Sequence, residues 1–134
     1  MKIVARGIEK SFADKRGRRQ PVLGGLDLEV AAGEFVCLLG PNGCGKTTFL
    51  NLLAGFTLPD GGEVSVDGRP VTGPSPDRVM IMQSYDLFPW RTVLANVEYG
   101  LEMQGWERKR RRQKARELLA LVGLEACEEQ HPGE

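Results

Sequence analysis

The sequence lacks a long hydrophobic run, an excess of either charge, and a cysteine pattern. No apolar stretch approaches the roughly 18 residues of a membrane span, and no signal peptide opens the chain. The 18 Lys and Arg residues balance the 18 Asp and Glu residues, so the overall charge favours neither nucleic acid nor an anionic membrane. The three cysteines and His131 show no metal-ligand spacing. These absences predict a cytosolic protein with reduced thiols and a surface histidine.

The composition that is present is that of one globular domain. The 134 residues have a mass of 14.8 kDa and are 41% hydrophobic, which is enough for one core of ordinary size. No internal repeat and no low-complexity segment is found. We therefore expect a single folded domain.

The most informative motif is Gly40-Pro41-Asn42-Gly43-Cys44-Gly45-Lys46-Thr47. It is a complete G-x-x-x-x-G-K-[ST] phosphate-binding loop. Its glycines let backbone N–H groups turn inward around phosphate oxygens, while Lys46 places a positive charge on the β- and γ-phosphates. The Thr47 hydroxyl is a hard oxygen ligand of the kind that Mg²⁺ prefers. The motif predicts that the chain binds a nucleoside triphosphate with Mg²⁺.

The residues around the loop support this prediction. The apolar run 34–39 is typical of a buried parallel strand that ends at Gly40. Residues 47–54 predict a helix closed by Gly55, and four of its side chains are available for packing: Phe49, Leu50, Leu52 and Leu53. Strand, glycine loop and helix in this order are the context that the motif requires.

Further elements are expected on both sides of the loop. Residues 1–12, 22–30, 63–66 and 78–82 show the alternation or apolar character of strands. Residues 92–104 predict a helix, and residues 106–121 predict another that ends near Gly123. The apolar residues expected on the buried side of this second helix are Ala115, Leu118, Leu119 and Val122.

The whole chain resembles the first half of the ATPase subunit of an ATP-binding cassette (ABC) transporter. The resemblance extends over residues 22–35, residues 53–64 and residues 82–93, the last of which are similar to the family's Q-loop. The triplet Phe88-Pro89-Trp90 is most similar to importers of nitrate, sulfonate, taurine or bicarbonate. The resemblance implies an α/β P-loop NTPase fold of ABC ATPase type. Antiparallel strands would begin it, the start of a helical subdomain would end it, and the C-terminal core strands would be missing.

The resemblance also implies domain limits and site residues. Residues 1–134 would form a partial nucleotide-binding domain, with a strand-rich ATP-binding core in 1–90 and the start of the helical subdomain in 91–134. Lys46 and Gln83 would act in catalysis, and Thr47 and Gln83 would hold Mg²⁺. Phe12 would stack on the adenine, although a core position is the alternative. The residues expected to bind ATP are Phe12, Gly40, Pro41, Asn42, Gly43, Cys44, Gly45, Lys46, Thr47 and Thr48.

Partners are implied mainly by residues 85–90. Tyr85, Leu87, Phe88 and Trp90 form either a satellite core or an exposed patch that receives a helix of the membrane subunit. The resemblance implies that transmembrane permease subunits bind at residues 85–90 and that a second ATPase subunit is a further partner. A periplasmic or extracellular solute-binding protein would be an indirect partner. The basic run 108–112 indicates a solvated helix face rather than a nucleic-acid site. The expected location is cytoplasmic, peripheral at the inner face of the cell membrane.

The C-terminal residues 131–134 resemble the stretch before the family signature L-S-G-G-Q. The sequence contains neither this signature nor the second acidic motif with its catalytic glutamate, nor the switch histidine. We therefore expect ATP binding rather than hydrolysis, and poor stability if this is the entire polypeptide. Two alternatives are a non-catalytic nucleotide-binding or interaction module left by gene degradation, and another P-loop enzyme. The second alternative would need an acceptor site or a base-recognition motif, and neither is found.

Overall fold

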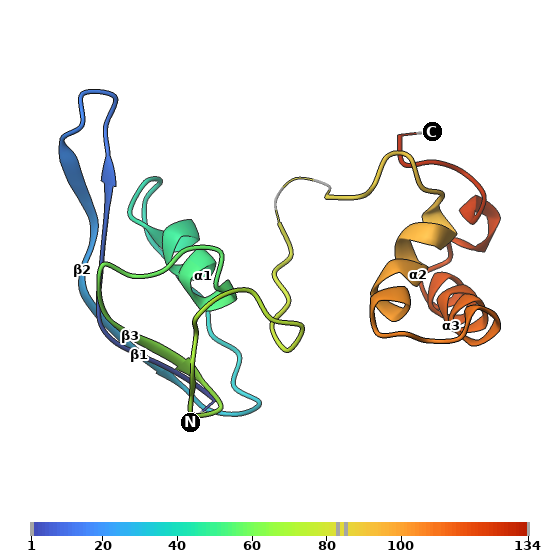
Figure 1. Cartoon of the computed structure of the whole chain (residues 1–134), viewed down its shortest axis with the longest axis horizontal. Coiled ribbons are helices and arrows are strands. Elements are labelled where there is room, and N and C mark those ends of the chain that lie inside the picture. The colour runs from blue at the N-terminus through green and yellow to red at the C-terminus, as the bar shows by residue number, and fades with distance from the viewer. Residues whose placement is uncertain (1, 83, 85, 134) are drawn as a thin grey trace. The chain divides into compact units, whose positions relative to one another are not determined.

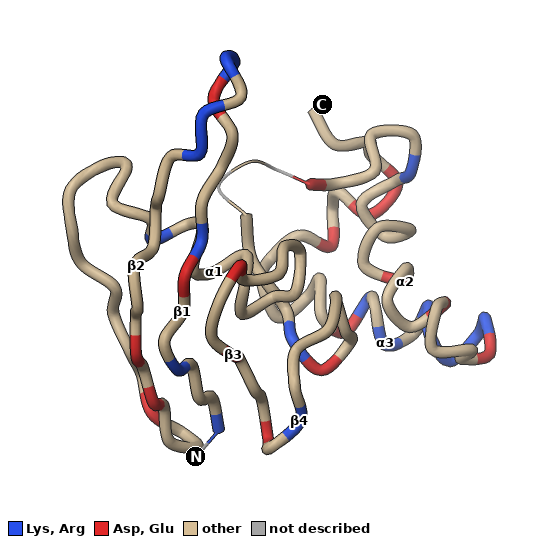
Figure 2. Tube along the Cα trace, turned by 60° about the vertical axis from the view of Figure 1, so that its left-hand side comes forward, with Lys and Arg blue, Asp and Glu red and all other residues tan. Residues whose placement is uncertain are grey.

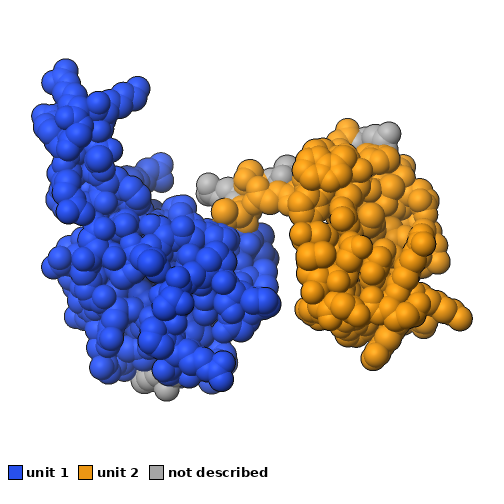
Figure 3. Space-filling view, viewed as in Figure 1, with its two compact units in different colours: residues 1–81 blue, residues 82–134 orange. Residues whose placement is uncertain are grey.

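The structure is a computed structural model that describes residues 2–82, 84 and 86–133. It divides into two compact units, residues 1–81 and residues 82–134 (Figures 1 and 3). The loop 86–90 therefore belongs with the helices that follow it. Each unit has a hydrophobic core of its own, and each is described separately.

Unit 1 is built on a four-stranded antiparallel sheet with the strand order β2-β1-β3-β4 (Figure 2). Its strands are β1 (Ile3–Ala13), β2 (Arg19–Val30), β3 (Gly61–Val66) and β4 (Arg69–Pro70). The central strand is β1, in which Ile3 lies opposite Val30 of β2 on one side and Val66 of β3 on the other. The antiparallel strands predicted at the start of the chain are confirmed.

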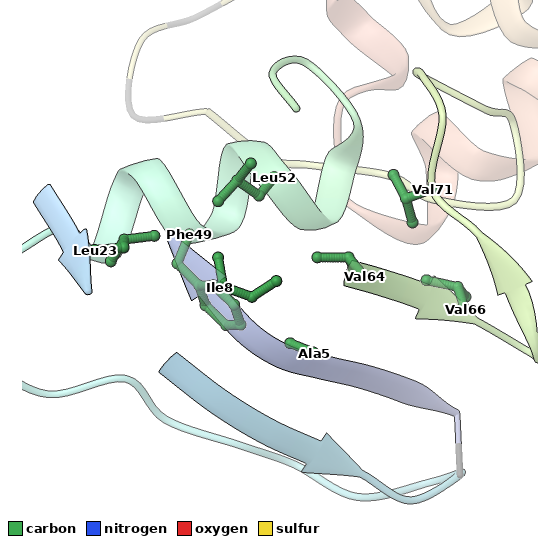
Figure 4. Packing of buried hydrophobic residues seen from close by; sticks show 8 residues of the cluster. All are labelled: Ala5, Ile8, Leu23, Phe49, Leu52, Val64, Val66 and Val71. Carbon is green, nitrogen blue, oxygen red and sulfur yellow. The ribbon is translucent and has the colours of Figure 1, made fainter. Parts of the chain in front are cut away.

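Helix α1 (Lys46–Ala54) supplies much of the core of unit 1. Phe49 and Leu52 lie three residues apart on one helical face and point toward Ile8 and Val64 of the sheet (Figure 4). Phe49 and Leu52 are 1% exposed, and Ile8 is completely buried. The helix ends where Gly55 adopts a left-handed conformation, with φ of 82°. Leu50, which we expected to pack, is instead 42% exposed.

Two predicted strands do not form. Residues 34–39 and 78–82 carry no strand or bridge. Several of their apolar side chains are open to solvent, with Phe35 91%, Leu39 92% and Ile81 93% exposed, whereas Leu38 packs partly buried against the core. The physical reason is that a parallel strand needs a neighbour distant in the chain for its backbone hydrogen bonds, and the described residues offer these two segments none. The predictions of a buried strand over residues 34–39 and of a short apolar strand over residues 78–82 are wrong for this structure.

Unit 2 is helical. It consists of α2 (Val93–Met103), α3 (Arg108–Leu121) and a short 3₁₀ helix η1 (Glu125–Cys127) that we did not predict. Its core is formed by Leu94, Ala115 and Leu119, with Val93 and Val97 packed against them. Two residues predicted to be on the buried side of the second helix are exposed, Leu118 on α3 by 41% and Val122, the residue after α3, by 65%. No helix in the described part of the chain is long and apolar enough to cross a membrane.

Local capping explains where α2 begins. The Thr92 hydroxyl accepts a hydrogen bond from the Ala95 N–H at 3.2 Å, as a helix N-cap does. Backbone hydrogen bonds satisfy two further N–H groups of the first turn, since Val93 donates to the Gln130 carbonyl and Leu94 donates to the Glu128 carbonyl. The helix predicted over residues 92–104 is thereby confirmed within its capping residues.

Candidate functional site

The phosphate-binding motif forms a loop that passes directly into α1. The N-cap of this helix is Gly45, which is left-handed with φ of 97° and has no side-chain cap. The first helical bond is donated by the Phe49 N–H to the Gly45 carbonyl at 2.9 Å. The N–H groups of residues 46–48 therefore precede the helical ladder and remain available at the positive end of the helix dipole. Such an end is suited to an anion.

Lys46 folds back over the entrance of the loop. Its Nζ atom donates to the carbonyl oxygens of Gly40 at 2.7 Å and Pro41 at 2.8 Å. The same ammonium lies 3.7 Å from the Cys44 Sγ atom. The charged group is thus held in the concave side of the loop, where an ammonium would meet phosphate oxygens.

Glycine is required at residues 40 and 45 of the loop for two different steric reasons. A Cβ atom on Gly40 would lie 2.7 Å from the Cys44 Sγ atom. A Cβ atom on Gly45 would lie 2.8 Å from Leu23 Cδ2, in the hydrophobic core. Only glycine fits both places without displacing a neighbour, so the loop is packed closely against itself and against β2.

The remaining predicted site residues are placed as follows. Thr47 is exposed and Thr48 is half-buried, both in the first turn of α1. Phe12 lies on β1 opposite Gln20, is 46% exposed, and has the Lys10 ammonium 5.6 Å from its ring centroid. Gln83 lies outside the described residues, so its predicted roles in catalysis and Mg²⁺ binding have no structural counterpart here. Within the described part of the chain, no group of three His, Cys, Asp or Glu residues could hold a metal ion.

Asp60 organises the strand end beside Phe12, and sequence reasoning missed it. Its carboxylate accepts hydrogen bonds from the Ser11 N–H at 2.8 Å and from the Lys10 ammonium at 3.1 Å, and Arg19 lies at 3.1 Å. The Ser11 N–H, followed by the Lys10 ammonium, lowers the pKa of this carboxyl below its ordinary value. The Lys10 ammonium also donates to the Leu58 carbonyl at 2.7 Å. The turn before Gly61 is thus tied to β1, near its Phe12 end.

In unit 2, the loop before α2 presents apolar side chains. Trp90 is 73% exposed and Leu87 is 50% exposed, whereas Tyr85 lies outside the described residues. A groove of about 370 Å³ is lined by Leu87 and by residues of α2, α3 and the turn after α3. Its lining residues are Leu87, Val93, Asn96, Val97, Leu118, Leu119, Leu121, Val122 and Leu124. The sequence left two alternatives for this cluster, a satellite core and an exposed patch. The exposure of Leu87 and Trp90 favours the exposed patch.

Two residues of the basic run 108–112, Arg111 and Arg112, and the nearby Arg116 pair with acidic neighbours. Figure 2 shows the basic and acidic residues along the chain. Arg116 forms a two-bond pair with Glu128 at 2.8 and 2.9 Å, and Arg112 contacts Glu129 at 3.2 Å. Arg111 contacts Glu102 at 3.2 Å. The interspersed charges are typical of a solvated helix face.

A phosphate loop closed by a lysine and followed by an uncapped helix N-terminus defines a P-loop nucleotide-binding protein. Residues 23–134 match the family model described as ABC transporter. The chain belongs to the ABC transporter family, as the resemblance of the sequence predicted.

Known relatives and structures agree with this assignment. The taurine import ATP-binding protein TauB of Pseudomonas aeruginosa is 44% identical over 133 residues, which cover 99% of this chain and 50% of TauB. An ATP-binding protein of Brucella abortus is 52% identical over 99 residues, or 74% of this chain and 38% of the relative. The solved dimeric ATP-binding cassette MJ0796, bound to ADP and Pi, has a TM-score of 0.84 at 26% identity. The matched region covers 97% of this chain and 61% of the MJ0796 chain.

The match to MJ0796 confirms the predicted fold class, an α/β P-loop fold of the ABC ATPase type. The chain spans half or less of the length of these two curated relatives.

Proposed function

We propose that this chain is the ATP-binding component of an ABC import system, in which ATP binding and hydrolysis are coupled to solute transport across the cytoplasmic membrane. The observation that carries the proposal is the convergence of the Lys46 ammonium and the free N–H groups of residues 46–48 on one loop. The import role is supported by TauB, which is named a taurine import ATP-binding protein. The nucleotide is supported by MJ0796, which was solved with ADP and Pi.

In this proposal each residue of the loop has a defined task. The residues of 40–45 other than Pro41 direct backbone N–H groups at the phosphates, and Lys46 exchanges the carbonyls of Gly40 and Pro41 for the β- and γ-phosphate oxygens. Thr47 supplies a hydroxyl ligand to Mg²⁺, which neutralises charge on the phosphates when it is bound. Thr48 adds a further N–H group at the helix start. Phe12 stacks on the adenine, and Gln83 orients water beside the metal.

The partner surface is proposed on unit 2. The exposed Trp90 and the apolar groove beside Leu87 suit an amphipathic helix, and the occupant that an import system offers is a cytoplasmic helix of the membrane permease. A second ATPase subunit completes the proposed assembly, since MJ0796 is dimeric. The solute-binding protein is an indirect partner and nucleic acid is not one. The proposed location is the cytoplasm, at the inner face of the cell membrane.

Nucleotide binding is tested by titrating the 134-residue chain with a fluorescent ATP analogue in the presence of Mg²⁺. Lys46→Ala removes the charged donor and should weaken binding about 10- to 100-fold, because a hydrogen bond to a charged group contributes about 1.5–3 kcal/mol. The matched control is Lys114→Ala, which removes an equal charge from α3, where Lys114 pairs with Glu117 at 3.2 Å. Equal binding by all three proteins, or no saturable binding by the parent chain, would contradict the proposal.

A further inference from the structure

Asn96, in the first turns of α2, is bonded to the backbone of the preceding loop at several points. Its Nδ2 atom lies within hydrogen-bonding distance of the carbonyls of Phe88 at 3.1 Å, Arg91 at 3.1 Å and Thr92 at 3.0 Å, which share its two N–H groups. Its Oδ1 atom accepts from the Phe88 N–H at 2.8 Å. Both ends of one side-chain amide are therefore used to hold residues 88–92.

This arrangement is unusual for an asparagine inside a helix. Asparagine weakens helix interiors because its side-chain amide competes for backbone groups. Here the Asn96 amide bonds backbone groups of the preceding loop. The Phe88 and Arg91 groups that it pairs belong to a turn, closed by an Arg91 N–H bond to the Phe88 carbonyl at 3.1 Å. Backbone groups in a loop of this kind otherwise depend on water, so Asn96 gives residues 88–92 a fixed shape.

The residues that Asn96 holds carry part of an aromatic cluster. The Phe88 ring meets the Tyr99 ring edge-on at a centroid distance of 4.7 Å, and the Trp90 ring lies 5.6 Å from Phe88. The Arg91 guanidinium covers Tyr99 at 4.9 Å and pairs with Glu102 at 2.9 Å. These contacts hold Phe88 on α2, whereas Trp90 remains 73% exposed.

We infer that Asn96 is a positioning residue that sets residues 88–92 in their binding shape before any partner arrives, so that Trp90 is presented as a ready anchor. The inference rests on the proposed function for the identity of the partner, a permease helix. A large aromatic side chain is the kind of residue that dominates interfaces. An anchor that is already ordered avoids the entropy loss of ordering on binding.

The test uses Trp90 itself as the reporter. The chain has two tryptophans, so Trp106→Phe leaves Trp90 as the single one. In this background we compare Asn96→Ala with Thr92→Ala, which removes only the helix cap on Ala95. Time-resolved fluorescence anisotropy measures the mobility of Trp90, and hydrogen exchange measures the Phe88 amide.

Asn96→Ala should abolish the restricted component of the Trp90 anisotropy decay and speed exchange of the Phe88 amide roughly tenfold, the factor equivalent to one hydrogen bond. Thr92→Ala should leave both unchanged. Asn96→Asp keeps the acceptor for the Phe88 N–H and loses the Nδ2 donations to the loop carbonyls, so it should free Trp90 while the Phe88 amide stays protected. This second variant keeps the test decisive if Asn96→Ala fails to fold.

Two results would overturn the inference. One is a Trp90 as restricted in both Asn96 variants as in the parent. The other is an equal loosening by Thr92→Ala, which would mean that Trp90 only follows the overall stability of α2. Binding of the fluorescent ATP analogue is measured on the same samples, and since its loop belongs to unit 1 it should not change. A failure of the nucleotide-binding proposal is thereby kept separate from a failure of this one.

Discussion

The sharpest quantitative prediction concerns Gly45→Ala compared with Gly43→Ala in the phosphate loop. Both glycines are left-handed, with φ of 97° and 80° respectively. Their surroundings differ. A Cβ atom on Gly45 would lie 2.8 Å from Leu23 Cδ2 and 3.2 Å from Val22 Cγ1, whereas a Cβ atom on Gly43 would meet nothing within 4 Å. The pair separates backbone strain from packing within one loop.

The expected magnitudes follow from this difference. A left-handed conformation costs an L-residue about 1–2 kcal/mol, and this applies to both variants. Gly45→Ala must in addition displace Leu23, which is only 8% exposed in the core of unit 1. Overpacking of this kind costs about 1–3 kcal/mol. We expect destabilisation of unit 1 by about 1–2 kcal/mol for Gly43→Ala and about 2–5 kcal/mol for Gly45→Ala.

Hydrogen exchange of β1 peptides is the suitable assay, because β1 is the central strand of unit 1 and its slow amides report global opening. Since a factor of ten corresponds to about 1.4 kcal/mol, Gly43→Ala should speed exchange roughly 5- to 30-fold and Gly45→Ala by roughly 30-fold or more. Gly24→Ala is the control, because no atom lies within 4 Å of its Cβ position and its φ is not positive. Equal acceleration by the two loop variants would refute the steric reasoning.

Three further predictions use the same chain. Thr47→Ala should remove the dependence of ATP-analogue binding on Mg²⁺, while Thr47→Ser should retain it, because serine keeps the hydroxyl ligand; equal Mg²⁺ dependence in titrations of both would contradict the assignment. Phe49→Ala should destabilise unit 1 by about 3–5 kcal/mol and abolish analogue binding. It should leave the urea transition of tryptophan fluorescence unchanged, because Trp90 and Trp106 both lie in unit 2. Hydrogen bonds from Arg116 lower the pKa of Glu128 below its ordinary value of 4.5, so this carboxylate stabilises unit 2 above pH 4.5 and that stability is lost as pH falls through the lowered pKa. Glu128→Gln should flatten this acid loss in urea midpoints measured against pH, and an unchanged slope would be inconsistent with the pairing.

The elements that could be predicted from the sequence are those whose contacts are local. Helix α2 begins at a threonine cap and α1 ends at a left-handed glycine, and both signals lie within a few residues of the bonds that they make. The phosphate loop is equally local, since Lys46 reaches carbonyls only five and six residues away. Motif, cap and helix could therefore be predicted together.

The wrong predictions concern contacts between distant segments. Residues 34–39 have the composition of a buried strand, but composition cannot supply the neighbouring strand whose backbone would pair with them. The prediction that Leu118 and Val122 are buried is wrong for a related reason. The period of a helix shows which residues share a face, but not how much of that face is covered by other elements. Asn96 carried a signal that could have been used: an asparagine four residues after a threonine cap indicates a side chain that bonds outside the helix.

Local contacts at the two ends of the phosphate loop hold its shape. The segment that enters the loop, residues 34–39, forms no strand in this structure and contributes no ladder. The exit is held firmly, because Gly45 fits against Leu23 and Phe49 is buried between α1 and the sheet. The entrance is held by Lys46, whose ammonium bonds the carbonyls of Gly40 and Pro41 back onto the helix. The residue proposed to bind the phosphates is therefore also the one that closes the loop before the nucleotide arrives.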